Sequence, residues 1–146
     1  MDDYMSNIFK QNFDIDGSIA AKGKPIEEEI KKMLQHNFFR TPPPKSLDRQ
    51  EFSLEYNELV NKKYSVHDVM ATLAEFTIET IVTSLKFLPK KIKCILITGG
   101  GCRNVYLMKR LKDKLKLKIY KETQLGINFD YIEAELIAYL SARSLY

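Results

Sequence analysis

An apolar run that ends in three glycines constrains this chain more than any other stretch of its sequence. Residues 94–98 are Cys-Ile-Leu-Ile-Thr, Gly99, Gly100 and Gly101 follow directly, and a helical pattern begins soon after. This order predicts a strand, a tight loop and a helix. Glycines let the backbone adopt positive φ and approach a ligand closely, and the free N–H groups at a helix start favour negative charge. The loop either only turns the chain or holds part of a nucleotide, and by itself it leaves both interpretations open.

The residues after the glycines complete a β-α-β pattern. Apolar residues at helical spacing predict a helix around 107–115, and Leu117 and Ile119 alternate with lysines as in a short edge strand. Parallel strands joined by a crossover helix leave their ligand crevice at the carboxyl ends of the strands, which is where the glycines lie. We therefore expect an α/β fold that is rich in helices and has an incomplete, few-stranded sheet.

Helical periodicity dominates the rest of the chain. An apolar stripe over residues 1–9 predicts a first helix, and Pro25 opens a second helix with acidic residues in its first turns. Ser65 and Asp68 form a capping-box signature, and the apolar stripe after them predicts a long amphipathic helix that continues to Pro89.

Two connecting segments and a last helix complete the pattern. Residues 14–17 predict a turn and not a calcium loop, because Pro25 stands where such a loop needs a glutamate. Residues 41–46 contain three prolines and predict a rigid, ordered connector. After Asp130 we expect a final helix whose buried side chains are Ile132, Leu136, Ile137 and Leu140, with alanines at 134, 138 and 142 allowing close packing.

Length and composition favour one cytoplasmic domain. With 146 residues and 45% hydrophobic content, the chain is long enough for one core and too short for two. No apolar run approaches the roughly 20 residues that span a bilayer, and the acidic start differs from a signal peptide, so no membrane partner is expected. Cys94 and Cys102 lack metal-ligand spacing and are expected to be free thiols.

The net charge of +4 is distributed unevenly. Between Lys86 and Lys121, twelve Lys or Arg residues oppose a single acid, Asp113, so this segment carries about +11. A basic segment of that size attracts nucleic acid or phosphates. Lysines on the solvated faces of a strand and a helix account for the same charge, and aromatic residues are sparse there. We favour the solvated-face interpretation and do not expect a nucleic-acid partner.

No complete catalytic set can be assembled from these residues. The sequence offers no Ser/His/Asp set, no paired metal ligands and no complete phosphate-binding P-loop. Glu133 lies in the predicted first turn of the last helix, where a carboxylate near the strand ends can bind a sugar hydroxyl or a metal. The helix dipole alone also favours an acid there, and the spacing by itself supports that simpler explanation.

Five blocks of the sequence, taken in order, match one family. They are 13–17 with 20–23; 42–46 with Arg49 and Phe52; 68–77; 97–101 with Asn104; and 125–126 with Asp130, Ile132, Glu133 and Ala134. On these blocks the chain resembles the carboxyl-terminal part of the anhydro-N-acetylmuramic acid kinases, members of the actin-like, hexokinase-like ATPase superfamily with its ribonuclease H-like fold.

The resemblance implies two lobes around a cleft, ATP as the phosphoryl donor, and Mg²⁺. In such enzymes an activated water opens the anhydro-sugar ring while its O6 receives the phosphate, which gives N-acetylmuramic acid 6-phosphate in cell-wall recycling. The resemblance places Glu133 on the sugar side of the cleft. It assigns nucleotide contacts to Gly99, Gly100, Gly101, Arg103 and Asn104.

Part of the family's pattern has no counterpart in this sequence. The phosphate loop of Gly-Thr-Ser type, the Asp-Gly after it and the catalytic aspartate are all missing. We therefore expect residues 1–146 to form one domain, a truncated carboxyl-terminal lobe that has no catalytic residue and is inactive alone. A separately encoded amino-terminal lobe is the expected partner. The alternative is a non-catalytic remnant, dimerising through an open sheet edge.

Overall fold

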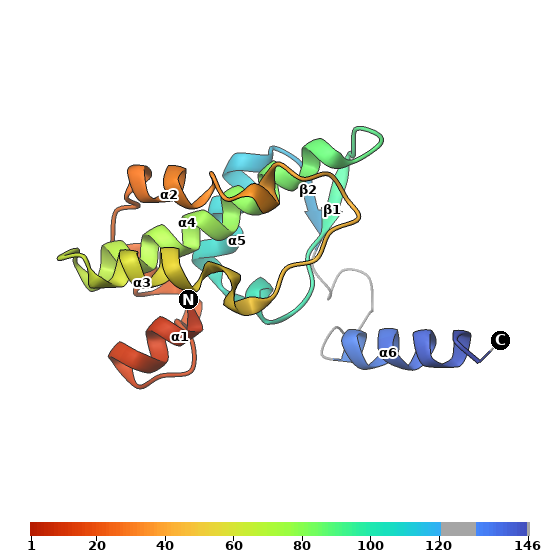
Figure 1. Cartoon of the computed structure of the whole chain (residues 1–146), viewed down its shortest axis with the longest axis horizontal. Helices are drawn as coiled ribbons and strands as arrows, with labels where there is room; N and C mark the ends of the chain where they lie inside the picture. The colour runs from red at the N-terminus through yellow and green to blue at the C-terminus, as the bar shows by residue number, and fades with distance from the viewer. Residues whose placement is uncertain (121–130, 146) are drawn as a thin grey trace.

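The computed structural model describes residues 1–120 and 131–145, apart from the side chains at 49, 50, 53–55, 132 and 133 (Figure 1). Six α-helices and two strands lie within these ranges. The helices are α1 (Asp2–Tyr4), α2 (Glu27–Met33), α3 (Ser53–Asn61), α4 (Val66–Ser84), α5 (Val105–Leu115) and α6 (Ile132–Arg143). The strands are β1 (Cys94–Leu96) and β2 (Lys118–Tyr120).

Helix α4 is the centre of the fold. The hydroxyl of Ser65 accepts a hydrogen bond from the N–H of Asp68 at 3.1 Å, so the predicted cap is confirmed. One face of α4 is fully buried, and α2, α5 and the short helical turn at residues 20–22 pack against it. The core cluster contributed by α4 comprises Val69, Met70, Leu73 and Ala74.

The predicted first and second helices are confirmed with shifted ends. Helix α1 continues into a wider π-helical turn over Met5–Phe9, and Tyr4 and Met5 join the core, whereas Ile8 is half exposed. Helix α2 buries Ile30 and ends at Met33. A separate helical turn over Asn37–Phe39 follows it.

Strands β1 and β2 form a parallel two-stranded sheet joined through α5 (Figure 1). Cys94 pairs with Lys118, Ile95 with Ile119, and Leu96 with Tyr120. This register confirms the predicted β-α-β unit and the few-stranded sheet. Cys94 and Leu96 are exposed, so the described elements leave one face of β1 uncovered.

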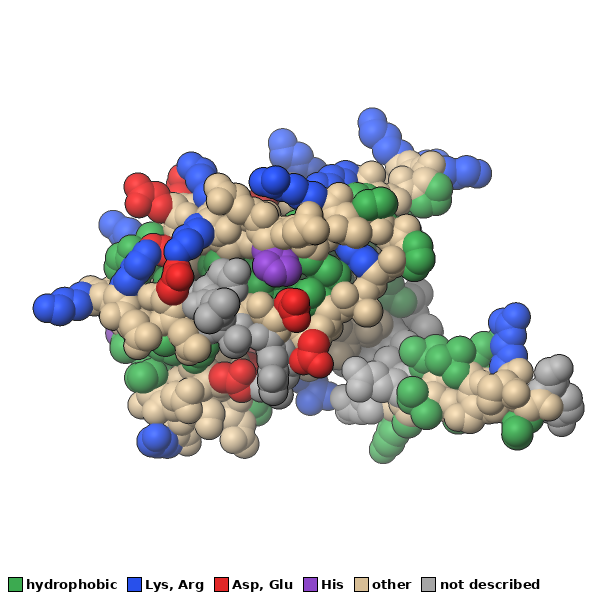
Figure 2. All heavy atoms as spheres, in the orientation of Figure 1, with side chains coloured by type: hydrophobic (Ala, Val, Ile, Leu, Met, Phe, Trp, Pro, Cys, Tyr) green, Lys and Arg blue, Asp and Glu red, His purple; other side chains and the backbone are tan. Residues whose placement is uncertain are grey.

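The prediction that α6 buries its apolar stripe is wrong for the side chains that the structure describes. Leu136, Ile137 and Leu140 are 51–63% exposed, and the three alanines on the helix are exposed as well. Figures 1 and 2 show α6 apart from the other helices, with its hydrophobic side chains uncovered. The stripe is exposed because no described element packs against it. The side chain of Ile132 lies outside the described part.

Within residues 1–120 and 131–145, no helix combines the length and apolar character needed to cross a membrane.

Candidate functional site

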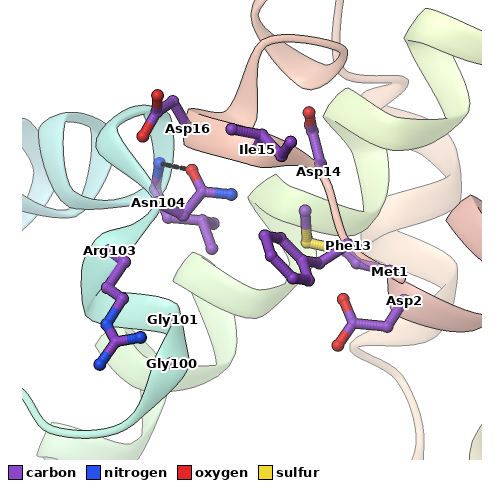
Figure 3. A pocket seen from close by; sticks show the side chains of 11 residues that line it. Met1, Asp2, Phe13, Asp14, Ile15, Asp16, Gly100, Gly101, Arg103 and Asn104 are labelled. Carbon is purple, nitrogen blue, oxygen red and sulfur yellow. Dashed lines mark hydrogen bonds between the residues drawn. The ribbon is translucent and has the colours of Figure 1, made fainter. Parts of the chain in front are cut away.

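A cavity of about 460 Å³ lies beside the glycine loop (Figure 3). One wall consists of Gly100, Gly101, Arg103, Asn104 and Leu107. The other consists of Met1, Asp2, Phe13, Asp14, Ile15 and Asp16. Pockets for small molecules usually measure about 300–1,000 Å³. Four of the five predicted nucleotide contacts therefore line one cavity of suitable size, and Gly99 is the one that does not.

The three glycines differ in what the fold requires of them. Gly99 has φ 85°, a left-handed conformation that favours glycine, and it turns the chain after β1. Gly100 and Gly101 have no positive φ, and a Cβ added to either would meet no atom within 4 Å. Backbone conformation thus explains the glycine at 99, whereas neither conformation nor packing within the described chain explains those at 100 and 101. Backbone left bare toward a cavity is the arrangement that lets a ligand approach closely.

Asn104 connects the loop to α5. Its side-chain Oδ1 accepts a hydrogen bond from the N–H of Leu107 at 2.9 Å, which makes Asn104 the cap of the helix. The Oδ1 atom is thereby occupied, and the amide nitrogen must face the other way. Figure 3 shows this nitrogen pointing into the cavity and the guanidinium of Arg103 lying beside Gly100 and Gly101. The glycine-loop wall presents donors and positive charge.

The second wall begins with a turn that Asp14 stabilises. This buried carboxylate accepts the N–H of Ile19 at 2.9 Å and the N–H of Ala20 at 3.0 Å. Asp14 therefore holds the turn and has little capacity left for a ligand. Asp16, at φ 55°, and Gly17, at φ 72°, complete the turn predicted from the sequence.

The turn packs directly against the start of α5. A Cβ added to Gly17 would lie 2.4 Å from Oδ1 of Asn104 and 2.4 Å from Cβ of Tyr106. Only a glycine permits this contact, which sets the separation of the two cavity walls. The sequence predicts the turn but no site role for Asp2, Phe13 or Asp16. In the sequence, only the Asp-Ile-Asp-Gly pattern at residues 14–17 indicates the turn that forms this wall.

Glu133 is the second residue of α6, and its side chain lies outside the part of the chain that the structure describes. The sugar-side role of Glu133 therefore stays a prediction.

Among the described residues, no three His, Cys, Asp or Glu side chains come together as metal ligands. Mg²⁺ usually binds one or two carboxylates together with substrate phosphates, so its predicted role stays a prediction.

A second cavity, of about 530 Å³, lies between α2, α4 and α5 and is lined by ion pairs. The carboxylate of Glu75 is buried and accepts two hydrogen bonds from Arg110, and Lys114 pairs with both Glu75 and Glu79. Desolvation is the largest single effect on the pKa of the Lys114 amine and lowers it. The hydrogen bonds to Glu75 and Glu79 and the negative charges of both residues together raise this pKa above its ordinary value. This cluster joins α5 to α4.

The basic segment forms ion pairs within the fold. Arg110 and Lys114 pair with acids of α4, and Lys118 lies over the ring of Tyr120. Figure 2 shows Lys and Arg side chains along the rim of the body, with acidic side chains among them on the left of the view. The other described Lys and Arg side chains of this segment are exposed, as the solvated-face interpretation expects, and the absence of a nucleic-acid partner stays a prediction. Cys94 is exposed, Cys102 is buried and both are free thiols, as predicted.

Comparisons with known proteins point to one family. A family model described as anhydro-N-acetylmuramic acid kinase matches residues 1–146. Proteins of that name from Zymomonas mobilis and Rhodopseudomonas palustris (strain BisB18) are 37% and 38% identical over 100% and 99% of the chain. A third, from Paramagnetospirillum magneticum, is 39% identical over 90% of the chain. The chain spans 37–39% of the length of these relatives. The whole-chain family match and the agreement of the three relatives lead to one conclusion: this chain belongs to the anhydro-N-acetylmuramic acid kinase family.

Proposed function

We propose that this chain is the nucleotide-binding lobe of a kinase that acts on 1,6-anhydro-N-acetylmuramic acid. The observation that carries the proposal is the convergence of Gly100, Gly101, Arg103 and Asn104 on one cavity. Bare backbone near a helix start, a guanidinium and an amide donor are groups that suit a nucleotide. The names of the relatives support the choice of reaction and sugar.

In the complete enzyme ATP supplies the phosphoryl group, water opens the anhydro ring and the product is N-acetylmuramic acid 6-phosphate. Mg²⁺ held on the phosphates would neutralise the charge that develops during transfer. Catalysis of this kind depends on positioning, so the part played by this chain is to hold and orient the nucleotide. The reaction belongs to cell-wall recycling in the cytoplasm.

An amino-terminal lobe that supplies the phosphate loop and the catalytic aspartate completes the enzyme in this proposal. The chain spans 39% of the length of its relative from Z. mobilis, and its sequence has no counterpart of the phosphate loop or catalytic aspartate. The two lobes would enclose a cleft of the actin-like type, and this chain alone would be inactive. The β-α-β unit with its surrounding helices is compatible with that architecture.

Two measurements, made one after the other, test the proposal. Titration calorimetry of the chain with ATP and MgCl₂ is expected to show one binding site, and failure to bind would overturn the nucleotide-binding role. The chain is then mixed with the part of the Z. mobilis relative that it does not match, and ATP-dependent phosphorylation of the anhydro sugar is assayed. Nucleotide binding without association or turnover in this mixture would reject completion by the amino-terminal lobe and leave the nucleotide site intact.

A non-catalytic dimer is a second candidate, favoured by the exposed apolar residues of α6 and β1. Leu96, Leu136 and Ile137 are 40–63% exposed, and open strand edges readily pair with other chains. Multi-angle light scattering at working concentration separates the candidates. A dimer that persists when the amino-terminal part is added supports the non-catalytic dimer, and a monomer counts against it.

A further inference from the structure

The two walls of the 460 Å³ cavity differ in charge. Arg103 and the bare backbone of Gly100 and Gly101 lie on one side. Asp2 and Asp16 are exposed carboxylates on the other side. A triphosphate carries several negative charges, so it is attracted to the first wall and repelled by the second. A nucleotide in this cavity therefore has one electrostatically favoured orientation.

The second wall also carries an uncommitted aromatic ring. Phe13 is 58% exposed, and Figure 3 shows its ring pointing from this wall toward Asn104 and Arg103. Phe39, Phe52 and Phe76 pack against one another elsewhere, but no ring contact of Phe13 occurs within the described part of the chain. The backbone beside it is fixed, because the turn that Asp14 holds begins at the next residue. A positioned ring with a free face is a stacking surface for a base.

Asp16 also lines the cavity, three residues after Phe13 on the same wall. It adopts a left-handed conformation, and its carboxylate makes no hydrogen bond or ion pair with another described residue. A carboxylate accepts hydrogen bonds from neighbouring hydroxyls such as those of a ribose.

We infer that Phe13 stacks against the base of the nucleotide, that Asp16 accepts a ribose hydroxyl, and that the phosphates extend past Gly100 and Gly101 toward Arg103. This inference rests on the proposed function and specifies the nucleoside half of the same site. Phe13 and Asp16 become specificity residues for nucleosides, and Arg103 becomes the contact for the phosphates.

Three ligands separate the parts of the site: adenosine, ADP and inorganic tripolyphosphate. Their affinities are measured by calorimetry on the full chain for wild type, Phe13→Ala, Phe13→Tyr and Arg103→Gln. Phe13→Ala is expected to weaken the binding of adenosine and ADP about fivefold or more and to leave that of tripolyphosphate unchanged, because base stacking contributes about 1–3 kcal/mol. Phe13→Tyr keeps the ring and should stay within about twofold of wild type. Arg103→Gln should weaken ADP and tripolyphosphate while sparing adenosine.

The outcomes distinguish this inference from the function on which it rests. A wild-type chain that binds none of the three ligands overturns the proposed function together with the orientation. A wild-type chain that binds ADP, with Phe13→Ala equal to it, overturns the stacking inference alone. Phe13 is exposed, so the variants should fold, and circular dichroism melting curves check this. Phe13→Leu, which keeps apolar volume without an aromatic face, provides a second variant that should also lose adenosine.

Discussion

The guanidinium of Arg110, in α5, donates two hydrogen bonds to the carboxylate of Glu75, in α4. Nη2 reaches Oε1 at 3.0 Å and Nε reaches Oε2 at 3.1 Å, and the Glu75 side chain is 6% exposed. The amine of Lys114 lies 2.5 Å from the same Oε1. Helix α5 starts directly after the glycine loop, so this pairing fixes the helix that carries Asn104 and the cavity wall.

Glu75→Gln is expected to lower the free energy of unfolding by about 2–3 kcal/mol, because it removes the buried charge that Arg110 and Lys114 neutralise. The two cations are partly exposed, so water compensates part of the loss. Urea denaturation measures the change. Glu27→Gln is the matched control: its pair with Lys31 is highly exposed and should contribute less than about 0.5 kcal/mol. Equal losses in the two variants would contradict the buried-pair assignment.

Substitution by alanine is expected to destabilise the fold at Gly23 but not at Gly100. A Cβ at Gly23 would lie 2.0 Å from the backbone oxygen of His67, so Gly23→Ala should destabilise the chain by about 2 kcal/mol or more. A Cβ at Gly100 meets no atom, so Gly100→Ala should leave the melting temperature unchanged within experimental error.

Gly100→Val fills the space in front of the loop and should weaken ATP binding at unchanged stability. Normal ATP affinity in Gly100→Val would show that the nucleotide does not approach this backbone.

Two substitutions at Asn104 separate its cap from its site role. Asn104→Ala removes the acceptor for the Leu107 N–H and should cost about 1 kcal/mol of stability. Asn104→Asp keeps a good cap but replaces the amide donor that faces the cavity with a negative charge. Both variants should bind ATP more weakly, whereas only Asn104→Ala should unfold at lower urea. Unchanged ATP affinity in both variants would restrict Asn104 to capping.

The hydrogen bond between Lys24 and Asp68 gives the stability a pH dependence. The backbone N–H of Lys24 donates to Oδ1 of Asp68 at 2.7 Å, and this bond, followed by the Ser65 interaction, holds the pKa of Asp68 below its ordinary value. A carboxyl with a lowered pKa stabilises the fold when ionised. The contribution is complete above the ordinary pKa of about 3.9 and is lost as the pH falls through the lower folded value.

Urea unfolding of wild type and Asp68→Asn between pH 7 and pH 2 tests this dependence. The two proteins should differ in stability at pH 7 and converge at the acidic end, because Asp68 then becomes neutral in wild type as well. Asp113→Asn, which changes an exposed acid on α5, serves as the control and should not alter the pH profile. A gap between wild type and Asp68→Asn that stays constant down to pH 2 would contradict the assignment.

Helix α3 shows where local sequence information was insufficient. No helix is predicted from the sequence over Ser53–Asn61, and the structure has one there. Phe52 precedes it and provides no side-chain cap, so the usual start signal is missing. Leu59, which is fully buried, anchors this helix in the core. Tertiary burial rather than capping therefore stabilises α3.

The sequence by itself determined the features that depend on near neighbours. These include the Ser65 cap, the β-α-β unit, the turn at Gly99 and the family, because spacing, capping and positive φ act within a few residues. Only the tertiary structure decided which distant residues share a surface. It placed Phe13 and Asp16 opposite a glycine loop more than 80 residues away in the sequence and left the apolar stripe of α6 exposed. The physical reason is that periodicity shows which side chains are apolar, whereas burial and cavity walls depend on what packs against them.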